Sequence, residues 1–227
     1  NQEGAVMYGS IKLNQLLNKA YYNSDISKSD LVKSALAKNA IEEIERIKSY
    51  VNTGVPIYYV VSGKDVENLE VIAFGGINDS KAIIKEIKTK KPSLSIKEHK
   101  NFTLLQEGEM ALALSKDKFI FRMSSNRQTN NLPNVFRDYF NSFNGKADPT
   151  IKTVFNKSKD VTIAYDYGKI MDFYMTVMPS IIGENTNYLK SFDWIKDFDL
   201  ITSINLAFDK GAISMSTDVY SEEMKKW

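Results

Sequence analysis

Apolar residues recur at helical spacing along several segments of the chain, and the longest of these covers about residues 30–52. Its apolar positions lie three or four residues apart and form one stripe, which is typical of a helix packed against a core. The stripe consists of Leu36, Ala40, Ile44, Ile47 and Val51. Glu42 and Arg46 are four residues apart on the polar side, so we expect an ion pair between them. Further helices are expected to contain residues 13–17, 82–87 (capped by Asp79), 132–143, 151–155 and 170–177.

Segments rich in β-branched and aromatic residues alternate with these helices and predict strands. The expected strands cover residues 6–11, 56–62, 69–74, 95–106, 109–115, 118–123, 161–165, 200–208 and 212–220. Turn-rich residues at 63–68 and Asp209-Lys210-Gly211 predict two hairpins, and Lys116-Asp117 predicts a tight turn within a three-stranded meander. Strands grouped in this way and mixed with helices indicate an α+β fold of antiparallel hairpins and meanders with packed helices.

The polar stretch 124–131, Ser-Ser-Asn-Arg-Gln-Thr-Asn-Asn, is the best candidate for a domain boundary. It separates a first α+β unit, residues 1–124, from a second unit, residues 132–227. Strand, helix and hairpin follow each other in both units, so we interpret them as two related halves. Ser221-Glu222-Glu223 reads as the start of one more helix, which suggests that the second unit is truncated and that the natural protein continues beyond Trp227.

Charge and cysteine content exclude several classes of function. The chain has thirty basic and twenty-eight acidic residues, so its net charge is +2. Proteins that bind nucleic acids usually have a clustered basic surface, and this charge balance does not indicate one. The chain has no cysteine, which excludes thiol nucleophiles, disulfides and cysteine-ligated metals. No apolar run approaches the roughly 18 residues of a membrane helix.

The sequence offers no motif for a metal ion, a nucleotide or another cofactor, and we assign no catalytic residue. His99 is the only histidine, so a catalytic triad or a multi-histidine metal site has no second histidine to use. We interpret it as an exposed residue of a strand or loop. Ser115 and Lys118 fit the Ser-x-x-Lys spacing of some acyl enzymes. They fall in a predicted hairpin turn, where the lysine stays solvated and protonated.

An acidic and aromatic cluster at residues 192–199 is the best candidate for a ligand site. Trp194 could stack on a sugar ring while Asp193 and Asp197 accept hydrogen bonds from its hydroxyl groups. A glycosidase needs two carboxylates about 5–10 Å apart across a cleft. The alternative is an amphipathic segment whose apolar residues enter the core while its aspartates face solvent.

Two other groups of residues have a functional and a structural interpretation. The lysines that follow the helix at 82–87 could contact phosphates, although lysines are common at the C-terminal ends of helices. They are Lys88, Lys90, Lys91, Lys97 and Lys100. The aromatic residues of the helix at 132–143 could line a groove, but their helical spacing favours a place in the core. They are Phe136, Tyr139, Phe140 and Phe143.

The first half of the chain also carries a family resemblance. A strand reading Val-Met-Tyr-Gly-Ser-Ile-Lys at 6–12 leads into a leucine-rich helix at 13–17, and a Pro-Ile-Tyr strand begins at Pro56. A helix like 80–88 and strands like 110–114 and 119–121 follow. In this order the region resembles a family of uncharacterised Bacteroidetes cell-envelope lipoproteins, a domain of unknown function.

The resemblance implies an exported protein that is tethered by an N-terminal lipid and has no assigned activity. It transfers no site residues. The lipid-accepting cysteine is absent from this sequence, so the anchor is expected either on a segment that has been removed or not at all. Contact with a membrane is accordingly expected only through a lipid anchor outside this chain.

Three function hypotheses follow. The first is a non-enzymatic, extracytoplasmic binding or interaction module at the cell envelope, periplasmic or at the surface, with a protein or a glycan as its partner. The second is a glycan-acting hydrolase that uses the carboxylates near 193–199. The third is a cytosolic scaffold domain. An exposed apolar patch of more than a few hundred Å² would favour the first, and a concave pocket with converging carboxylates would favour the second.

Overall fold

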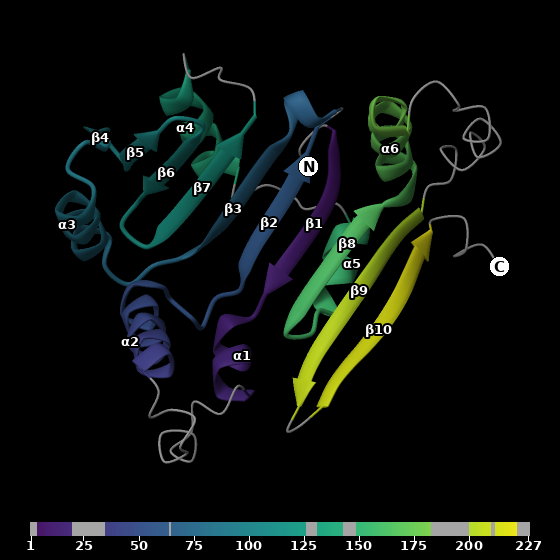
Figure 1. Cartoon of the computed structure of the whole chain (residues 1–227), viewed down its shortest axis with the longest axis horizontal. Helices are drawn as coiled ribbons and strands as arrows, with labels where there is room; N and C mark the ends of the chain where they lie inside the picture. The colour runs from purple at the N-terminus through teal and green to yellow at the C-terminus, as the bar shows by residue number, and fades with distance from the viewer. Residues whose placement is uncertain are drawn as a thin grey trace.

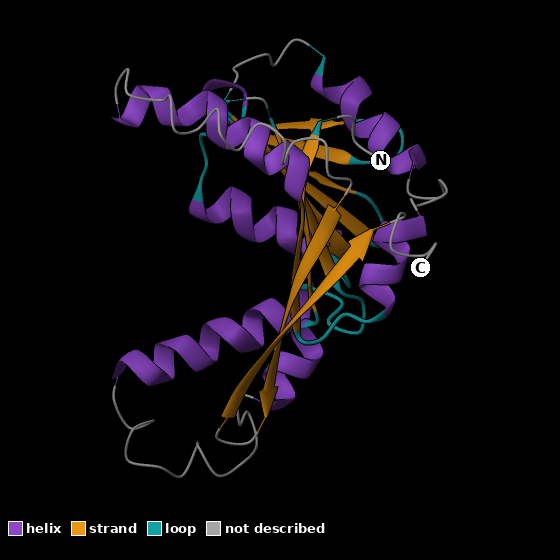
Figure 2. Ribbon diagram, turned by 90° about the vertical axis from the view of Figure 1, so that its right-hand side faces the viewer, coloured by secondary structure: helices purple, strands orange, loops and turns teal. Residues whose placement is uncertain are grey.

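The computed structural model describes residues 4–19, 35–63, 65–125, 131–142, 149–182, 200–209 and 212–221. These residues form one ten-stranded sheet, with helices on both of its sides (Figures 1 and 2). Each neighbouring pair of strands in the sheet is antiparallel. The α+β class predicted from the sequence is confirmed.

The elements follow the chain in this order. The strands are β1 (Ala5–Ile11), β2 (Ile57–Ser62), β3 (Glu70–Gly76), β4 (Ser95–Glu98), β5 (Thr103–Glu107), β6 (Met110–Leu114), β7 (Lys118–Ser124), β8 (Val161–Asp166), β9 (Leu200–Asp209) and β10 (Ala212–Ser221). The helices are α1 (Leu13–Lys19), α2 (Ala35–Tyr50), α3 (Ser80–Lys90), α4 (Leu132–Ser142), α5 (Pro149–Asn156) and α6 (Tyr167–Ile182), with a short 3-10 helix at Val66–Asn68.

The strand order is β10-β9-β8-β1-β2-β3-β7-β6-β5-β4, so the sheet continues across the predicted domain boundary (Figure 1). β1 lies next to β2 on one side and next to β8 on the other. The series β1-β2-β3 and β8-β9-β10 are each paired in chain order, and they meet through their first strands. Two related units would produce this arrangement. The division into units 1–124 and 132–227 stays a prediction.

One side of the sheet, here called the covered face, packs against α4 and α5, which lie behind the sheet in Figure 1. Under α4, Phe136 is fully buried and joins Ile72 and Ile120 in a hydrophobic cluster. Under α5, the fully buried Val154 joins Tyr8 and a buried alanine of β8 in a second cluster. Apolar burial in these two clusters stabilises the packing of α4 and α5 on the sheet.

The opposite side, here called the open face, carries α1, α2, α3 and α6 (Figure 2). α3 covers one end of it, where Ile84 and its neighbours pack on Leu105 and Leu114. Asp79 caps this helix, as predicted, because its side chain accepts a hydrogen bond from the backbone N–H of Ala82 at 3.0 Å. Among the described residues, no helix is long and apolar enough to cross a membrane.

Two predictions of local structure are wrong. The strand expected over 95–106 is two strands, because His99 N donates to the carbonyl of Phe102 at 2.9 Å and the chain turns back, pairing β4 with β5. Arg46 forms ion pairs with Glu43 and with Glu86 of α3, and no such pair joins it to Glu42 among the described residues. Sequence spacing within one helix could not reveal Glu86 as a partner of Arg46, because Glu86 lies on a different helix.

Candidate functional site: the open face of the sheet

The side chains of β8 alternate between the two faces of the sheet. Thr162 and Ala164 are fully buried on the covered face, whereas Val161, Ile163 and Tyr165 are only half-buried. Residues opposite each other in an antiparallel ladder point to the same side of the sheet. Ile163 is paired with a glycine of β1 and an isoleucine of β9, so the ladder defines which neighbouring positions share the open face.

From β10 to β6, the open face bears the odd-numbered residues of β1 from Met7 onward, those of β2, β3, β7, β8 and β10, and the even-numbered residues of β6 and β9. None of these strand positions carries a charged side chain. Its middle is formed by large apolar side chains that are only half-buried: Met7, Tyr59, Val61, Ile163, Ile204 and Leu206. Towards its margins, Met110 and Met123 are exposed.

The covered face of the same strands is more polar than the open face. The buried residues of β8 and β9 on this face are Thr162, Ala164, Ser203 and Asn205, and three of these four are polar. The Thr162 hydroxyl donates to Asn205 Oδ1 at 2.7 Å, and Asn205 Nδ2 donates to Asp218 Oδ2 at 3.0 Å. The polarity of this part of the sheet is therefore inverted, since hydrogen-bonded polar side chains lie inside and large apolar side chains lie on the accessible side.

Ser10 on β1 continues this polar row. It is paired with Thr162 in the ladder and is fully buried, and its hydroxyl has no hydrogen-bond partner among the described residues. A buried hydroxyl of this kind usually lowers stability. Between β1 and β8, the covered face therefore buries polar side chains where apolar ones would stabilise the fold more.

Tyr59 gives the open face an aromatic surface at its centre. A Cβ atom added to Gly9 would lie only 2.0 Å from the Tyr59 ring, so the ring lies directly over the β1 backbone. A side chain at position 9 would displace this ring, which explains the glycine. Partial burial raises the pKa of Tyr59 above its usual value, so its hydroxyl stays neutral at ordinary pH.

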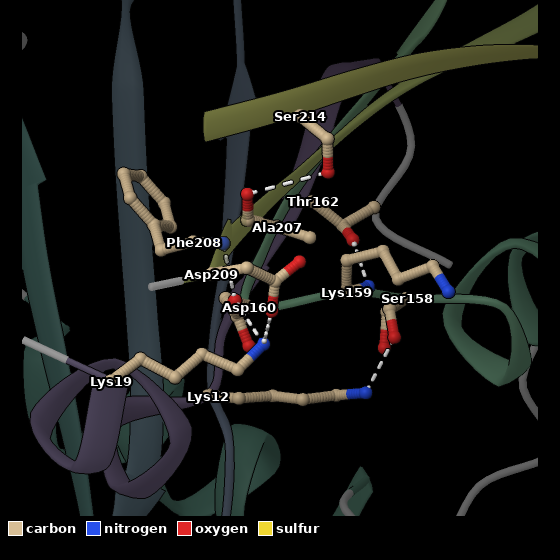
Figure 3. Close-up of polar contacts among 10 residues, drawn as sticks. All are labelled: Lys12, Lys19, Ser158, Lys159, Asp160, Thr162, Ala207, Phe208, Asp209 and Ser214. Atoms are coloured by element: carbon tan, nitrogen blue, oxygen red, sulfur yellow. Dashed lines mark hydrogen bonds and ion pairs between the residues drawn. The ribbon is translucent and has the colours of Figure 1, made fainter. Parts of the chain in front are cut away.

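A group of polar contacts fixes α1 at one end of the open face (Figure 3). The Asp160 carboxylate is 1 % exposed, and its Oδ2 accepts hydrogen bonds from Lys19 Nζ at 2.8 Å and from the backbone N–H of Phe208 at 2.7 Å. These contacts raise the pKa of Lys19, because the nearby carboxylate stabilises its charged form. Lys12 Nζ donates to the carbonyl of Ser158 at 2.5 Å in the same region.

The position of α1 creates a largely apolar hollow of about 560 Å³ between this helix and the β9–β10 hairpin, with the Lys19–Asp209 ion pair in its lining. Leu16 and Leu17 of α1 form one wall, and Phe208 and Ile213 form another. Phe208 and Ile213 are opposite each other in the ladder and belong to the open face. The hollow is therefore an extension of the open face.

None of the site residues proposed from the sequence is among the described residues of the open face. Asp193, Trp194 and Asp197 lie outside the described residues. His99 is half-buried and stacks on Phe102 with ring centroids 4.9 Å apart, so its interpretation as an exposed residue is wrong. Ser115 lies in the predicted hairpin turn, where its N–H donates to the carbonyl of Lys118 at 2.9 Å. Within the described part of the chain, no group of three or more acidic or histidine side chains could hold a metal ion.

Sequence reasoning missed the open face. A usable signal was present in β8 and β9, because Thr162-Ile163 and Ser203-Ile204 alternate polar and apolar residues with a period of two. Such alternation tells which side chains share a face. It normally indicates that the apolar side is covered and the polar side is wet. Here the reverse arrangement holds.

Comparisons with known proteins show the fold and leave the function open. No protein-family profile matches the chain, and no curated protein does. Three crystal structures of TP0453, a Treponema protein, are similar to it. Crystal forms III, IV and I have TM-scores of 0.56, 0.58 and 0.53 and are 9 %, 10 % and 10 % identical in sequence. Each match covers 95 % of this chain and 76 %, 76 % and 74 % of the respective TP0453 chains. At this level of identity, the similarity establishes a shared fold.

Proposed function

We propose that this chain is a non-enzymatic binding module that holds an apolar ligand, the acyl chain of a lipid or of a lipid-modified molecule, on the open face. The observation that supports the proposal is the inverted polarity of β8 and β9. Ile163 and Ile204 lie on the accessible side, while Thr162 and Asn205 lie inside. Folding alone does not favour this placement, since exchanging the two sets would bury more apolar area. A ligand that covers the open face would recover that burial.

The energetics of such a site favour an apolar occupant. Each Å² of apolar surface removed from water contributes roughly 25 cal/mol, and the strands present half-buried apolar side chains on several neighbouring positions. Contiguous apolar patches larger than a few hundred Å² commonly mark interaction sites. Met7, Met110 and Met123 lie on this face, and methionine side chains adapt their shape to different partners.

An acyl chain fits the face better than an extended peptide does. A peptide brings N–H and C=O groups that must be hydrogen-bonded when they are buried. From β10 to β6, the strand positions of the open face offer few polar side chains and no charged ones, whereas Glu107 of β5 and Glu98 of β4 lie on this face at its far end. An acyl chain has no such groups and needs only apolar contacts. The hollow beside Leu16 and Phe208 provides additional apolar space for its end.

The cell-envelope and extracytoplasmic location in this proposal rests on the family resemblance of residues 5–121. An exported, lipid-tethered protein would meet acyl chains at the membrane surface, so the location and the proposed ligand agree with each other. The proposal includes no nucleic acid and no metal.

The direct test is a fluorescence titration of the purified chain with NBD-labelled stearate. We expect saturable binding that unlabelled stearate displaces. Ile163→Lys places a charge in the middle of the face and should weaken binding at least about tenfold, or about 1.4 kcal/mol. Val55→Lys is the matched control, because Val55 is an exposed apolar residue outside the strands, and it should bind like the unmodified chain.

A circular dichroism spectrum establishes that each variant is folded. Absence of saturable binding in the folded, unmodified chain contradicts the proposal. Equal affinity of the Ile163→Lys and Val55→Lys variants would place the ligand elsewhere and contradict it as well.

A further inference from the structure

β10 is the last strand at one end of the sheet, and its outer edge is unpaired by any strand that the structure describes. Its ten residues all pair with β9. Residues 212–217 are exposed without interruption, and the side chains of Ile213 and Met215 are 69 % and 70 % exposed. Along these six residues, the backbone edge and both side-chain rows are accessible.

The strand at the other end of the sheet differs in each respect. β4 has four residues, and Lys97 and Glu98 occupy two of them. Short length and charged side chains are the usual means of preventing one sheet from pairing with another. β10 is long, has no proline and has one charged residue, Asp218. The two ends of the sheet thus differ in protection against pairing.

We propose that β10 pairs with β10 of a second copy of this chain, in antiparallel orientation about a two-fold axis at Ser216. In this register Ile213 lies opposite Val219 of the second copy, and Met215 lies opposite Thr217. Apolar and β-branched pairs of this kind stabilise neighbouring strands. Pairing would cover the two most exposed apolar side chains of the strand.

The charges of the strand are compatible with this register. Asp218 lies opposite Ser214 of the second copy, where its carboxylate can accept a hydrogen bond from the serine hydroxyl. The two Asp218 carboxylates are not opposite each other, and like charges in opposite positions would destabilise the pair. An interface in which one surface meets itself is the common geometry of homodimers.

The dimer would join two ten-stranded sheets into one. A two-fold axis perpendicular to the sheet keeps equivalent faces on the same side, so the two open faces would become one continuous surface. The pairing depends on the edge of β10 and does not require a ligand on the open face. Failure of one proposal therefore leaves the other in place.

Cysteine cross-linking tests the register. The chain has no cysteine, so the Ser216→Cys variant carries a single thiol, and in the proposed dimer the two thiols are opposite each other. Mild oxidation should give a covalent dimer in high yield. Ser95→Cys on β4 is the matched control, because it is also an exposed serine on an edge strand, and it should remain mostly monomeric.

Sedimentation velocity tests the association without a cross-link. We expect the unmodified chain to form dimers as its concentration rises, and Met215→Lys to weaken the dimer at least about tenfold. Val55→Lys, which alters an exposed apolar residue away from the edge, should leave the dimer unchanged. The proposal is overturned by a monomer at all concentrations, or by equal cross-linking of the Ser216→Cys and Ser95→Cys variants.

Discussion

The two faces of the sheet share one backbone but differ in how their side chains are placed. On the covered face, large apolar side chains such as Phe136 of α4 and Ile120 of β7 are buried together. On β8 and β9 the buried side chains of this face are instead mostly polar and hydrogen-bonded, as Thr162 is to Asn205. On the open face, large apolar residues such as Ile163 are half-exposed. Stability requires that buried polar groups be paired, but it does not require apolar groups on an accessible surface. The difference therefore separates residues that the fold needs from residues that a ligand would need.

The largest expected effect comes from the covered face. Phe136→Ala removes a fully buried ring and should lower the free energy of unfolding by about 3–5 kcal/mol. The change loses the burial energy of the ring and also leaves a cavity in the core. Phe121→Ala is the matched change on the open face, where the ring is half-buried, and its cost should be clearly smaller. Urea denaturation followed by circular dichroism measures both. Equal costs would show that the two faces contribute equally to folding.

A smaller effect separates two adjacent residues of β8. Thr162→Val keeps the side-chain shape but leaves Asn205 Oδ1 without its donor, and it should cost about 1–2 kcal/mol of stability. Ile163→Thr makes the opposite chemical change one residue later. It should cost less in stability and should weaken binding of NBD-labelled stearate.

The same urea titrations and stearate titrations measure this pair. A gain of stability in Thr162→Val, as hydrophobicity alone would suggest, contradicts the description of the polar row. Unchanged stearate binding in Ile163→Thr would argue that the apolar character of the open face has no part in ligand binding.

The smallest effect concerns the contact between α2 and α3 on the open side of the sheet. A hydrogen bond from Tyr50, together with Lys90 and Arg46, lowers the pKa of Glu86 below its usual 4.5. Because folding favours the ionised form, this contribution is complete above pH 4.5 and is lost as the pH falls below it. Glu86→Gln should therefore be slightly less stable than the unmodified chain at pH 7, and the difference should shrink at pH 3. A constant difference would exclude the charge of Glu86 as its cause.

Much of the fold was predictable from local sequence. The hairpin of β2 and β3 and the hairpin of β9 and β10 were expected from strand-forming runs separated by turn residues, and both are confirmed. The helix expected around residues 151–155 is α5, and Pro149 is its first residue, where proline is favoured. These features depend on residues close together in the chain, and a single sequence contains that information.

Long-range arrangement was not predictable in the same way. The pairing of β1 with β8 joins residues about 150 positions apart, such as Tyr8 and Ala164, and no local pattern specifies it. The contact of Arg46 with Glu86 depends on how α2 and α3 approach each other. The open face escaped prediction for the same reason. Alternation in β8 shows that Ile163 and Thr162 point to opposite sides, but which side receives helices is decided by the whole fold.

The most direct test of the ligand-binding claim uses alanine methyl groups on the two faces. Ala73 lies on the open face, whereas Ala113 and Ala164 are fully buried on the covered face. Intermolecular nuclear Overhauser effects between ¹³C-labelled alanine methyl groups and bound stearate report direct contact. We expect contacts to Ala73 and none to Ala113 or Ala164. Bound stearate that contacts Ala113 or Ala164 and not Ala73 would contradict the assignment of the open face as the ligand site.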